Sequence, residues 1–195
     1  MASTSDKLND EKLVDSIRKG HPRRYFKIVE RYQGKLFAYL YRLIGSKEEA
    51  EDLLQDVFIK AYRHLDSFDT KRKFSSWIYR IAHNEAVNFM KRRRLKKFVS
   101  WEEVTSAKDK LEMAGTEDDP EKIWSRKEER NKVNLAIEKL PQKYRQVLML
   151  RYFNNNSYEE IGKIIDKPLN TVGTLLNRAK KRLLAEIIKS EKRLK

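Results

Sequence analysis

The chain has 195 residues, enough for one domain or two small ones, and a formal net charge of +15 at pH 7. This excess of Lys and Arg favours a polyanionic partner, with nucleic acid ahead of an anionic membrane surface, over a merely soluble basic protein. The sequence has no cysteine, only three scattered histidines and no apolar run of membrane-spanning length, which argues against disulfides, thiolate or zinc sites and membrane insertion. Together with an amino terminus that lacks a signal peptide, these features predict a cytoplasmic protein with no cofactor and no metal.

The amino-terminal half has the pattern of amphipathic helices separated by stop signals. Apolar residues recur at steps of three and four, and glycines follow two of the runs. Ser46 and Glu49 form a capping box at the start of another run. The predicted helices cover 11–19, 22–44, 47–65 and 75–93, with the loop DSFDTKRK at 66–73.

The composition changes abruptly after Lys97. Between Glu102 and Glu121, eight acidic residues oppose two lysines, a net of −6 with little periodicity, which predicts a poorly ordered linker. Helical patterning then resumes, with proline starts, a break at the NNN run and a second capping box at Ser157 and Glu160. The predicted fold class is all-α, with two small helical domains and an acidic flexible linker, divided as 1–97, 98–119 and 120–195.

The last two predicted helices have the spacing of a helix-turn-helix. A short capped helix, a turn around 166–169 and a longer helix opening at Asn170 would let the first helix brace the second across a major groove. From Lys143 to Lys195, thirteen basic residues face five acidic ones, which favours DNA over a helical hairpin with no DNA role.

Few side chains on this second helix could read bases. The candidates are Asn170, Thr171, Thr174 and Asn177 near bases, and Arg178, Lys181 and Arg182 on phosphates. The module alone is therefore expected to bind weakly and to depend on DNA shape.

A second nucleic-acid surface is predicted on the helix over 75–93. Opposite its apolar stripe lie an aromatic ring, an arginine and two amides, followed by a basic run, and this pattern suits unstacked bases and a single-strand backbone. These residues are Trp77, Arg80, Asn84, Asn88 and Lys91. Two alternatives stay open: Trp77 as a core residue, and the basic run 92–97 as an ordinary solvated helix end.

The outer face of the helix over 47–65 is acidic in a chain of positive net charge. It carries Glu48, Glu49, Glu51, Asp52, Gln55 and Asp56. A solvated surface is one interpretation. A divalent-metal site is disfavoured, because no histidine or matching carboxylate helix accompanies the cluster. The sign of the charge favours a basic protein surface as the partner.

These segments, in this order, resemble the extracytoplasmic-function (ECF) group of bacterial RNA polymerase sigma factors. EEAEDLLQDVFIKAYRHLDSFD resembles region 2.2, KFSSWIYRIAHNEAVNFMKRRR resembles regions 2.3 and 2.4, and LPQKYRQVLMLRYFNNNSYEEIGKIIDKPLNTVGTLLNRAKKRL resembles region 4. The resemblance covers roughly residues 10–188. It implies a promoter-recognition subunit without catalysis of its own, which works with core RNA polymerase and is commonly held inactive by an anti-sigma factor.

The resemblance also implies roles for individual residues. Docking on the beta-prime clamp helices would involve Asp52, Gln55, Asp56 and Lys60. The melted minus-ten element and a flipped base would be held by Ser67, Phe68, Lys71, Lys73, Trp77, Arg80, Asn84, Asn88 and Lys91. The helix from Asn170 would bind the minus-thirty-five element, and region 4 would also contact the beta flap of the polymerase. The acidic linker would pass through polymerase channels. The chain departs from the family pattern at Asn170, Gly173 and Leu175, and its promoter specificity is expected to differ from that of its relatives at Gly173 and Leu175.

Two other functions are alternatives. A stand-alone helix-turn-helix regulator would use the same carboxyl-terminal helices, and it predicts tight duplex binding without polymerase. A metal-dependent nuclease would use the carboxylate cluster, but the other metal ligands are missing from the sequence.

Overall fold

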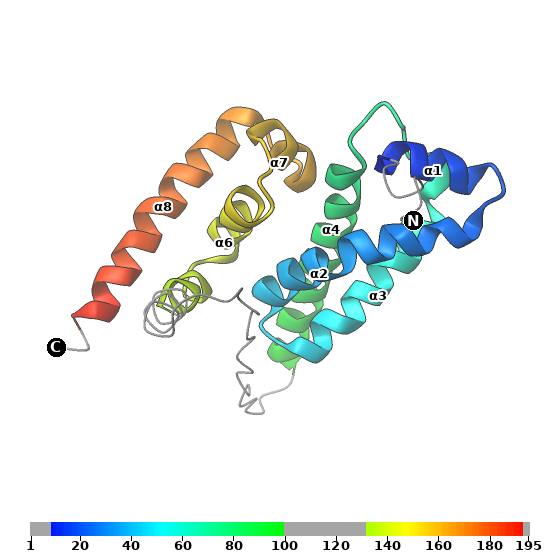
Figure 1. Cartoon of the computed structure of the whole chain (residues 1–195). Coiled ribbons are helices and arrows are strands. Elements are labelled where there is room, and N and C mark those ends of the chain that lie inside the picture. Colours follow the sequence, from blue (N-terminus) through cyan, green and yellow to red (C-terminus); the bar gives the residue numbers. More distant parts are fainter. Residues whose placement is uncertain (1–8, 100–131, 193–195) are drawn as a thin grey trace, which may run out of the picture. The chain divides into compact units, whose positions relative to one another are not determined.

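The computed structural model describes residues 9–99 and 132–192, which form two helical units (Figure 1). Every regular element in these ranges is a helix or helical turn, so the predicted all-α fold is confirmed. The first unit contains α1 (Asp10–Arg18), η2 (Pro22–Arg24), α2 (Tyr25–Ile44), α3 (Lys47–Arg63), η3 (Leu65–Ser67) and α4 (Phe74–Val99). The second contains helical residues 132–138, α6 (Gln142–Leu148), the π-helical turn η4 (Met149–Phe153), α7 (Tyr158–Ile165) and α8 (Leu169–Glu191).

Helix boundaries in the first unit follow local signals. Gly45 ends α2 in the left-handed conformation, with φ of 83°. Ser46 Oγ accepts a hydrogen bond from the Glu49 amide at 3.3 Å, while the Glu49 carboxylate accepts one from Arg93 of α4 at 2.9 Å. The hydroxyl half of the predicted capping box is therefore present, and its carboxylate joins α3 to α4.

Helix α4 extends to Val99, beyond its predicted end at Arg93. No glycine or proline interrupts residues 94–99, so the helical run continues. The predicted domain boundary at 97 consequently falls inside α4. The predicted acidic linker over 98–119 lies almost entirely outside the described residues.

The core of the first unit lies between α2, α3 and α4, and α1 covers one end of it (Figure 1). Its fully buried side chains alternate along each helix with polar ones at the three-to-four spacing expected of an amphipathic helix. They are Leu13 and Val14 of α1, Ile28, Leu36 and Leu40 of α2, Ala50, Val57 and Ala61 of α3, and Phe74, Ile78, Ala82 and Ala86 of α4.

One polar pair crosses this core. The Tyr39 hydroxyl of α2 lies 3.0 Å from Nδ1 of His83 in α4, and both side chains are buried. Burial lowers the pKa of His83 to about 4, because a charged imidazole would lose its hydration there. The neutral ring can accept the phenol hydrogen bond, so neither polar group is left unsatisfied.

We predict that His83 makes the stability of the first unit pH-dependent. Its pKa falls from 6.5 to about 4 on folding, so the unfolded chain binds the extra proton between these values and stability drops as the pH falls through them. The contribution is about 3 kcal/mol at most. Urea unfolding from pH 7 to 4 should show a shallower loss in His83→Gln than in wild type.

His64, which is exposed, provides the matched control. His64→Gln should retain the wild-type slope. If His83→Gln and His64→Gln show the same pH profile as wild type, the dependence originates in other groups.

In the second unit, α7 and α8 form the predicted helix-turn-helix. The capping box is complete: the Glu160 amide donates to Ser157 Oγ at 3.2 Å, and the Ser157 amide donates to Glu160 Oε2 at 2.7 Å. Helix α8 starts at Leu169, one residue before the predicted Asn170, because Pro168 supplies the cap position. The main buried side chains of this unit are Val147, Leu148, Met149, Leu150, Ile161, Ile164, Val172, Leu176 and Ala179.

The turn between α7 and α8 requires a glycine at position 162. The Gly162 carbonyl accepts the Lys167 amide at 3.0 Å, and a Cβ at position 162 would lie 2.8 Å from the Lys167 carbonyl oxygen. Asp166 takes the left-handed conformation with φ of 54°, which closes the turn. At Gly173 of α8, by contrast, an added Cβ would meet only a Tyr158 ring carbon at 3.8 Å.

We predict opposite effects for alanine at these two glycines. Gly162→Ala should destabilise the second unit by about 1–3 kcal/mol, because the backbone of the turn must move. Gly173→Ala should stabilise it by up to about 1 kcal/mol, because alanine is the better helix former and the space is free. Thermal unfolding of both variants checks this, and equal effects of the same sign would contradict the assigned geometry.

Candidate polymerase and nucleic-acid interfaces

Most of the predicted acidic face of α3 is open to solvent, whereas Glu49 is half-buried and paired with Arg93. Asp52, Gln55 and Asp56 are exposed on successive turns. Ile59 continues this row one turn further and is 50% exposed. We call these four residues the α3 face. Ile59 was not among the predicted contact residues, and its exposure adds an apolar contact to the charged surface.

Lys60 lies apart from the α3 face. Its ammonium group donates to Glu85 of α4 at 2.5 Å, and the Glu85 side chain is mostly buried. Lys60 therefore links two helices of the first unit, which supplies a structural role beside its predicted place in the polymerase contact.

The predicted nucleic-acid surface on α4 is a continuous exposed stripe. Arg80, Asn84, Asn88 and Lys91 are all exposed and follow one another at helical steps of three or four. We call these four residues the α4 stripe. The opposite side of the helix carries the fully buried Ile78, Ala82 and Ala86, so the stripe has a fixed direction.

Trp77 lies at the edge of this stripe and is half-buried. Its ring packs against Phe68 and Phe74, with centroid distances of 5.2 and 5.4 Å. The Phe68 side chain is only 3% exposed, so its predicted contact with DNA does not fit its burial. Its ring instead packs from the core side and supports the loop over 66–73. The sequence did not predict this, because apolar periodicity alone does not separate an exposed loop aromatic from a buried one.

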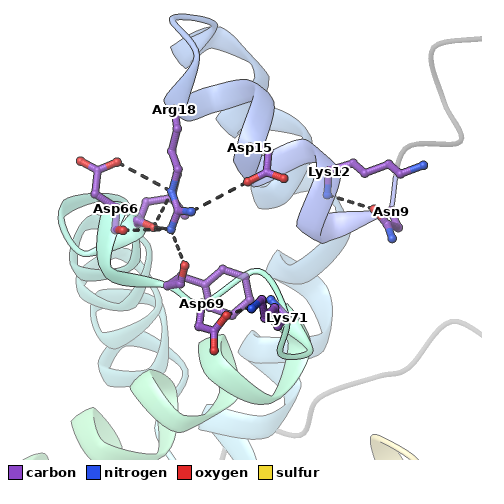
Figure 2. A network of polar contacts seen from close by, with 9 residues as sticks. Asn9, Lys12, Asp15, Arg18, Asp66, Asp69 and Lys71 are labelled. Carbon is purple, nitrogen blue, oxygen red and sulfur yellow. Dashed lines mark hydrogen bonds and ion pairs between the residues drawn. The ribbon is translucent and has the colours of Figure 1, made fainter.

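Ser67, the last residue of η3, is exposed, and so are Lys71 and Lys73 in the loop between η3 and α4. Within it, Asp69 Oδ1 accepts the Lys71 amide at 3.0 Å. Two residues of α1 hold the ends of this loop: Arg18 contacts its start (Figure 2) and Glu11 contacts the amide of Phe74 at its end. Neither α1 residue was predicted, because both contacts join positions far apart in the sequence.

The predicted DNA-facing residues of α8 lie on its open side. Thr171 is half-buried, whereas the others are exposed: Asn170, Thr174, Asn177, Arg178, Lys181 and Arg182. Thr174 Oγ1 donates to the Asn170 carbonyl at 2.9 Å, and the Arg182 guanidinium lies 5.1 Å from the ring centroid of Tyr144. Both groups are therefore partly engaged inside the unit.

Leu169 is a further candidate that sequence patterning assigned to the turn. It lies in the first turn of α8 and is 47% exposed. An exposed apolar side chain at a helix-turn-helix amino terminus suits a thymine methyl group.

Neither a metal site nor a membrane span is found in the described ranges. No three His, Cys, Asp or Glu side chains in residues 9–99 and 132–192 gather as metal ligands. Within the same part of the chain, every helix is too short or too polar to cross a bilayer.

Comparison with known proteins assigns both units. Residues 28–96 match the family model for Sigma-70 region 2, and residues 130–183 match that for Sigma-70, region 4. The ECF RNA polymerase sigma factor SigW of Bacillus subtilis is 34% identical over 189 residues, 91% of this chain and 96% of that protein. The ECF RNA polymerase sigma-E factor of Escherichia coli K12 is 35% identical over 179 residues, 90% of this chain and 93% of that protein.

A solved structure shares the fold. The sigma factor RpoE of Bartonella quintana, in complex with the anti-sigma factor NepR, has a TM-score of 0.69 and 23% identity, over 85% of this chain and 96% of that one. Given both family matches and the coverage of its relatives, the chain belongs to the ECF group of RNA polymerase sigma factors.

Proposed function

We propose that this chain binds core RNA polymerase, directs it to specific promoters and promotes DNA melting at initiation. The observation that carries the proposal is the pairing, within one unit, of an outward acidic α3 face with an outward α4 stripe of Arg80, Asn84, Asn88 and Lys91. One surface suits a basic protein partner and the other suits a polyanion, so a single small domain can join the two.

The α3 face is the proposed contact with the beta-prime clamp helices. Asp52, Gln55 and Asp56 supply acceptors and negative charge, and Ile59 supplies an exposed apolar contact. Interfaces commonly combine an apolar centre with a polar rim, and this short row carries both elements. Lys60 would act here mainly through its ion pair with Glu85, which holds α3 against α4.

The α4 stripe and the loop before it are the proposed contact with the melted minus-ten element. Asn84 and Asn88 carry both a donor and an acceptor for base edges, whereas Arg80 and Lys91 match phosphates or stack on bases. Ser67, Lys71 and Lys73 extend this surface along the loop. Trp77 would contact bases through the exposed part of its ring. The buried Phe68 would support this ring from the core side without touching DNA.

Helix α8 is the proposed contact with the minus-thirty-five element. Asn170, Asn177, Arg178 and Lys181 are its most available polar side chains, because the Thr174 hydroxyl is bonded within the helix and Arg182 packs on Tyr144. This limited set favours binding through phosphate contacts and duplex shape over direct hydrogen bonding to many bases. The region 4 unit would also contact the beta flap.

The proposal divides the chain into a region 2 domain over 1–97, an acidic linker over 98–119, whose first two residues still belong to α4, and a region 4 domain over 120–195. It also includes an anti-sigma factor as a partner and a cytoplasmic location. Support for the partner comes from a relative, since the Bartonella quintana sigma factor was solved with an anti-sigma factor bound. The activity needs no catalytic group in this chain, because the polymerase makes the transcript.

We predict that the chain stimulates promoter-directed initiation by core RNA polymerase. A library of genomic fragments would be transcribed in vitro with core enzyme, with and without the protein, and the transcript start sites mapped. Fragments with a shared minus-ten and minus-thirty-five pattern should yield transcripts only when the protein is present. No stimulation on any fragment, together with nanomolar duplex binding by the protein alone, would favour a stand-alone regulator.

We predict that Asp56→Lys weakens binding to core polymerase by about tenfold to a hundredfold, since it places a like charge against a basic partner surface. The fold should be unaffected, because Asp56 is exposed on α3. Fluorescence anisotropy of labelled protein titrated with core enzyme gives the affinity. Glu30→Lys, a charge reversal at an exposed position of α2, is the control. Equal affinities of wild type and Asp56→Lys would remove Asp56 from the interface.

A further inference from the structure

The start of the loop over 67–73 is held by the last residue of α1. The Arg18 guanidinium donates from Nε to the Leu65 carbonyl at 3.2 Å, and from Nη2 to the carbonyls of Asp66 at 3.1 Å and Phe68 at 2.5 Å. Figure 2 shows the guanidinium directed into this corner, with the carboxylates of Asp15 and Asp66 beside it. Each of these carboxylates lies 3.9 Å from Arg18.

The end of the same loop is held by the first turn of α1. Glu11 Oε1 accepts the backbone amide of Phe74 at 3.0 Å, where α4 begins. Glu11 and Arg18 are seven residues apart, about two helical turns, so they lie on the same side of α1. One helix therefore carries the contacts to both ends of the loop.

Helix α1 is itself firmly held. Leu13 and Val14 are fully buried in the core of the unit. The Asp10 carboxylate accepts from Arg31 at 2.8 Å and from the Tyr32 hydroxyl at 2.5 Å, which fixes the helix against α2. The loop is thus joined to the hydrophobic core through a rigid element.

Arginine suits this role for a chemical reason. The corner after α3 turns several backbone carbonyls toward one point, and one of them, that of Leu65, already accepts the Phe68 amide at 3.1 Å. A planar guanidinium presents several donors in a fixed fork and can satisfy them together, whereas a lysine ammonium acts as a point charge on a flexible stem. The Arg18 side chain is only 24% exposed, so these charge-assisted bonds are partly shielded from water.

We propose that Arg18, with Glu11, is a positioning residue for minus-ten recognition, holding the loop over 67–73 in its binding shape before DNA arrives. The inference rests on the proposed function of this loop. A loop that is already ordered loses less conformational entropy on capturing an unstacked base, so its contacts act in promoter opening and not in polymerase docking.

The test uses holoenzyme assembled from core polymerase and the full chain carrying Arg18→Ala, Arg18→Lys or Glu11→Ala. The DNA is the fragment most active with wild type. Two quantities are measured: the affinity for core enzyme, and the rate of promoter opening followed by permanganate reactivity of unpaired thymines. With Arg18→Ala the promoter should open about tenfold more slowly, because one charge-assisted anchor of the loop is lost. The affinity for core enzyme should be unchanged. Arg18→Lys should fall between Arg18→Ala and wild type.

Two further variants calibrate the assay. Lys19→Ala removes the same charge from the neighbouring, exposed position and should behave as wild type. Asn84→Ala should slow opening more than it weakens closed-complex binding, as expected of a residue that touches the melted strand. Opening at the wild-type rate in Arg18→Ala, or equal losses in core affinity and opening, would overturn the inference.

A measurement on the free protein separates this inference from the proposed function. Trp77 packs 5.2 Å from Phe68, whose carbonyl binds Arg18, so its fluorescence reports on the loop. The chain has three tryptophans, and Trp101→Phe with Trp124→Phe leaves Trp77 alone. In this background Arg18→Ala should raise acrylamide quenching of Trp77 while the helical circular dichroism stays constant. If wild type fails to direct initiation, the proposed function fails, and unchanged quenching would separately refute the anchoring by Arg18. If Arg18→Ala does not fold, Arg18→Lys provides both measurements.

Discussion

The first unit depends on one requirement: α4 must be buried along one side and open along the other. Ile78, Ala82 and Ala86 are fully buried, and the two alanines let the neighbouring helices approach closely. A rotation of α4 about its axis would expose these three buried apolar residues and would bury Arg80 and Asn84 without partners. Such a state loses apolar burial and leaves polar groups unsatisfied, so the packing that stabilises the unit also fixes the direction of the proposed nucleic-acid surface.

Polar ties between helices add orientation to this packing. Glu49 and Arg93 join α3 to the distal part of α4, and Lys60 and Glu85 join the same helices further along α3. Pairs with this degree of exposure contribute little to stability on their own. Their value is geometric, since they fix how the α3 face and the α4 stripe are turned relative to each other within the unit. A change at Lys60 can therefore affect either surface without touching a partner.

Local chemistry explains what the sequence could predict. The glycine stop after α2 and the capping boxes at Ser46 and Ser157 involve atoms at most four residues apart, so their patterns are visible in the chain itself. Contacts such as Arg18 to Leu65 join residues 47 positions apart, and no local pattern encodes them. Gly162 gave no signal either, because its neighbour is a carbonyl that approaches only after the turn closes. Buried Phe68 differs from expectation because periodicity alone does not fix which apolar side chains tertiary packing will cover.

Under the proposed function the two units would recognise DNA in different ways, and each contact is expected to be weak for a physical reason. Helix α8 has few free base-reading groups, since Thr174 bonds its own backbone. The α4 stripe has amides and cations that suit bases only after the duplex has opened. When weak sites belong to one chain, binding at one raises the effective concentration of the other, so moderate affinities multiply without any new contact. Under the proposed function, promoter choice would depend on both sites being satisfied together, and the loop held by α1 would contribute at the last step, when the base leaves the stack.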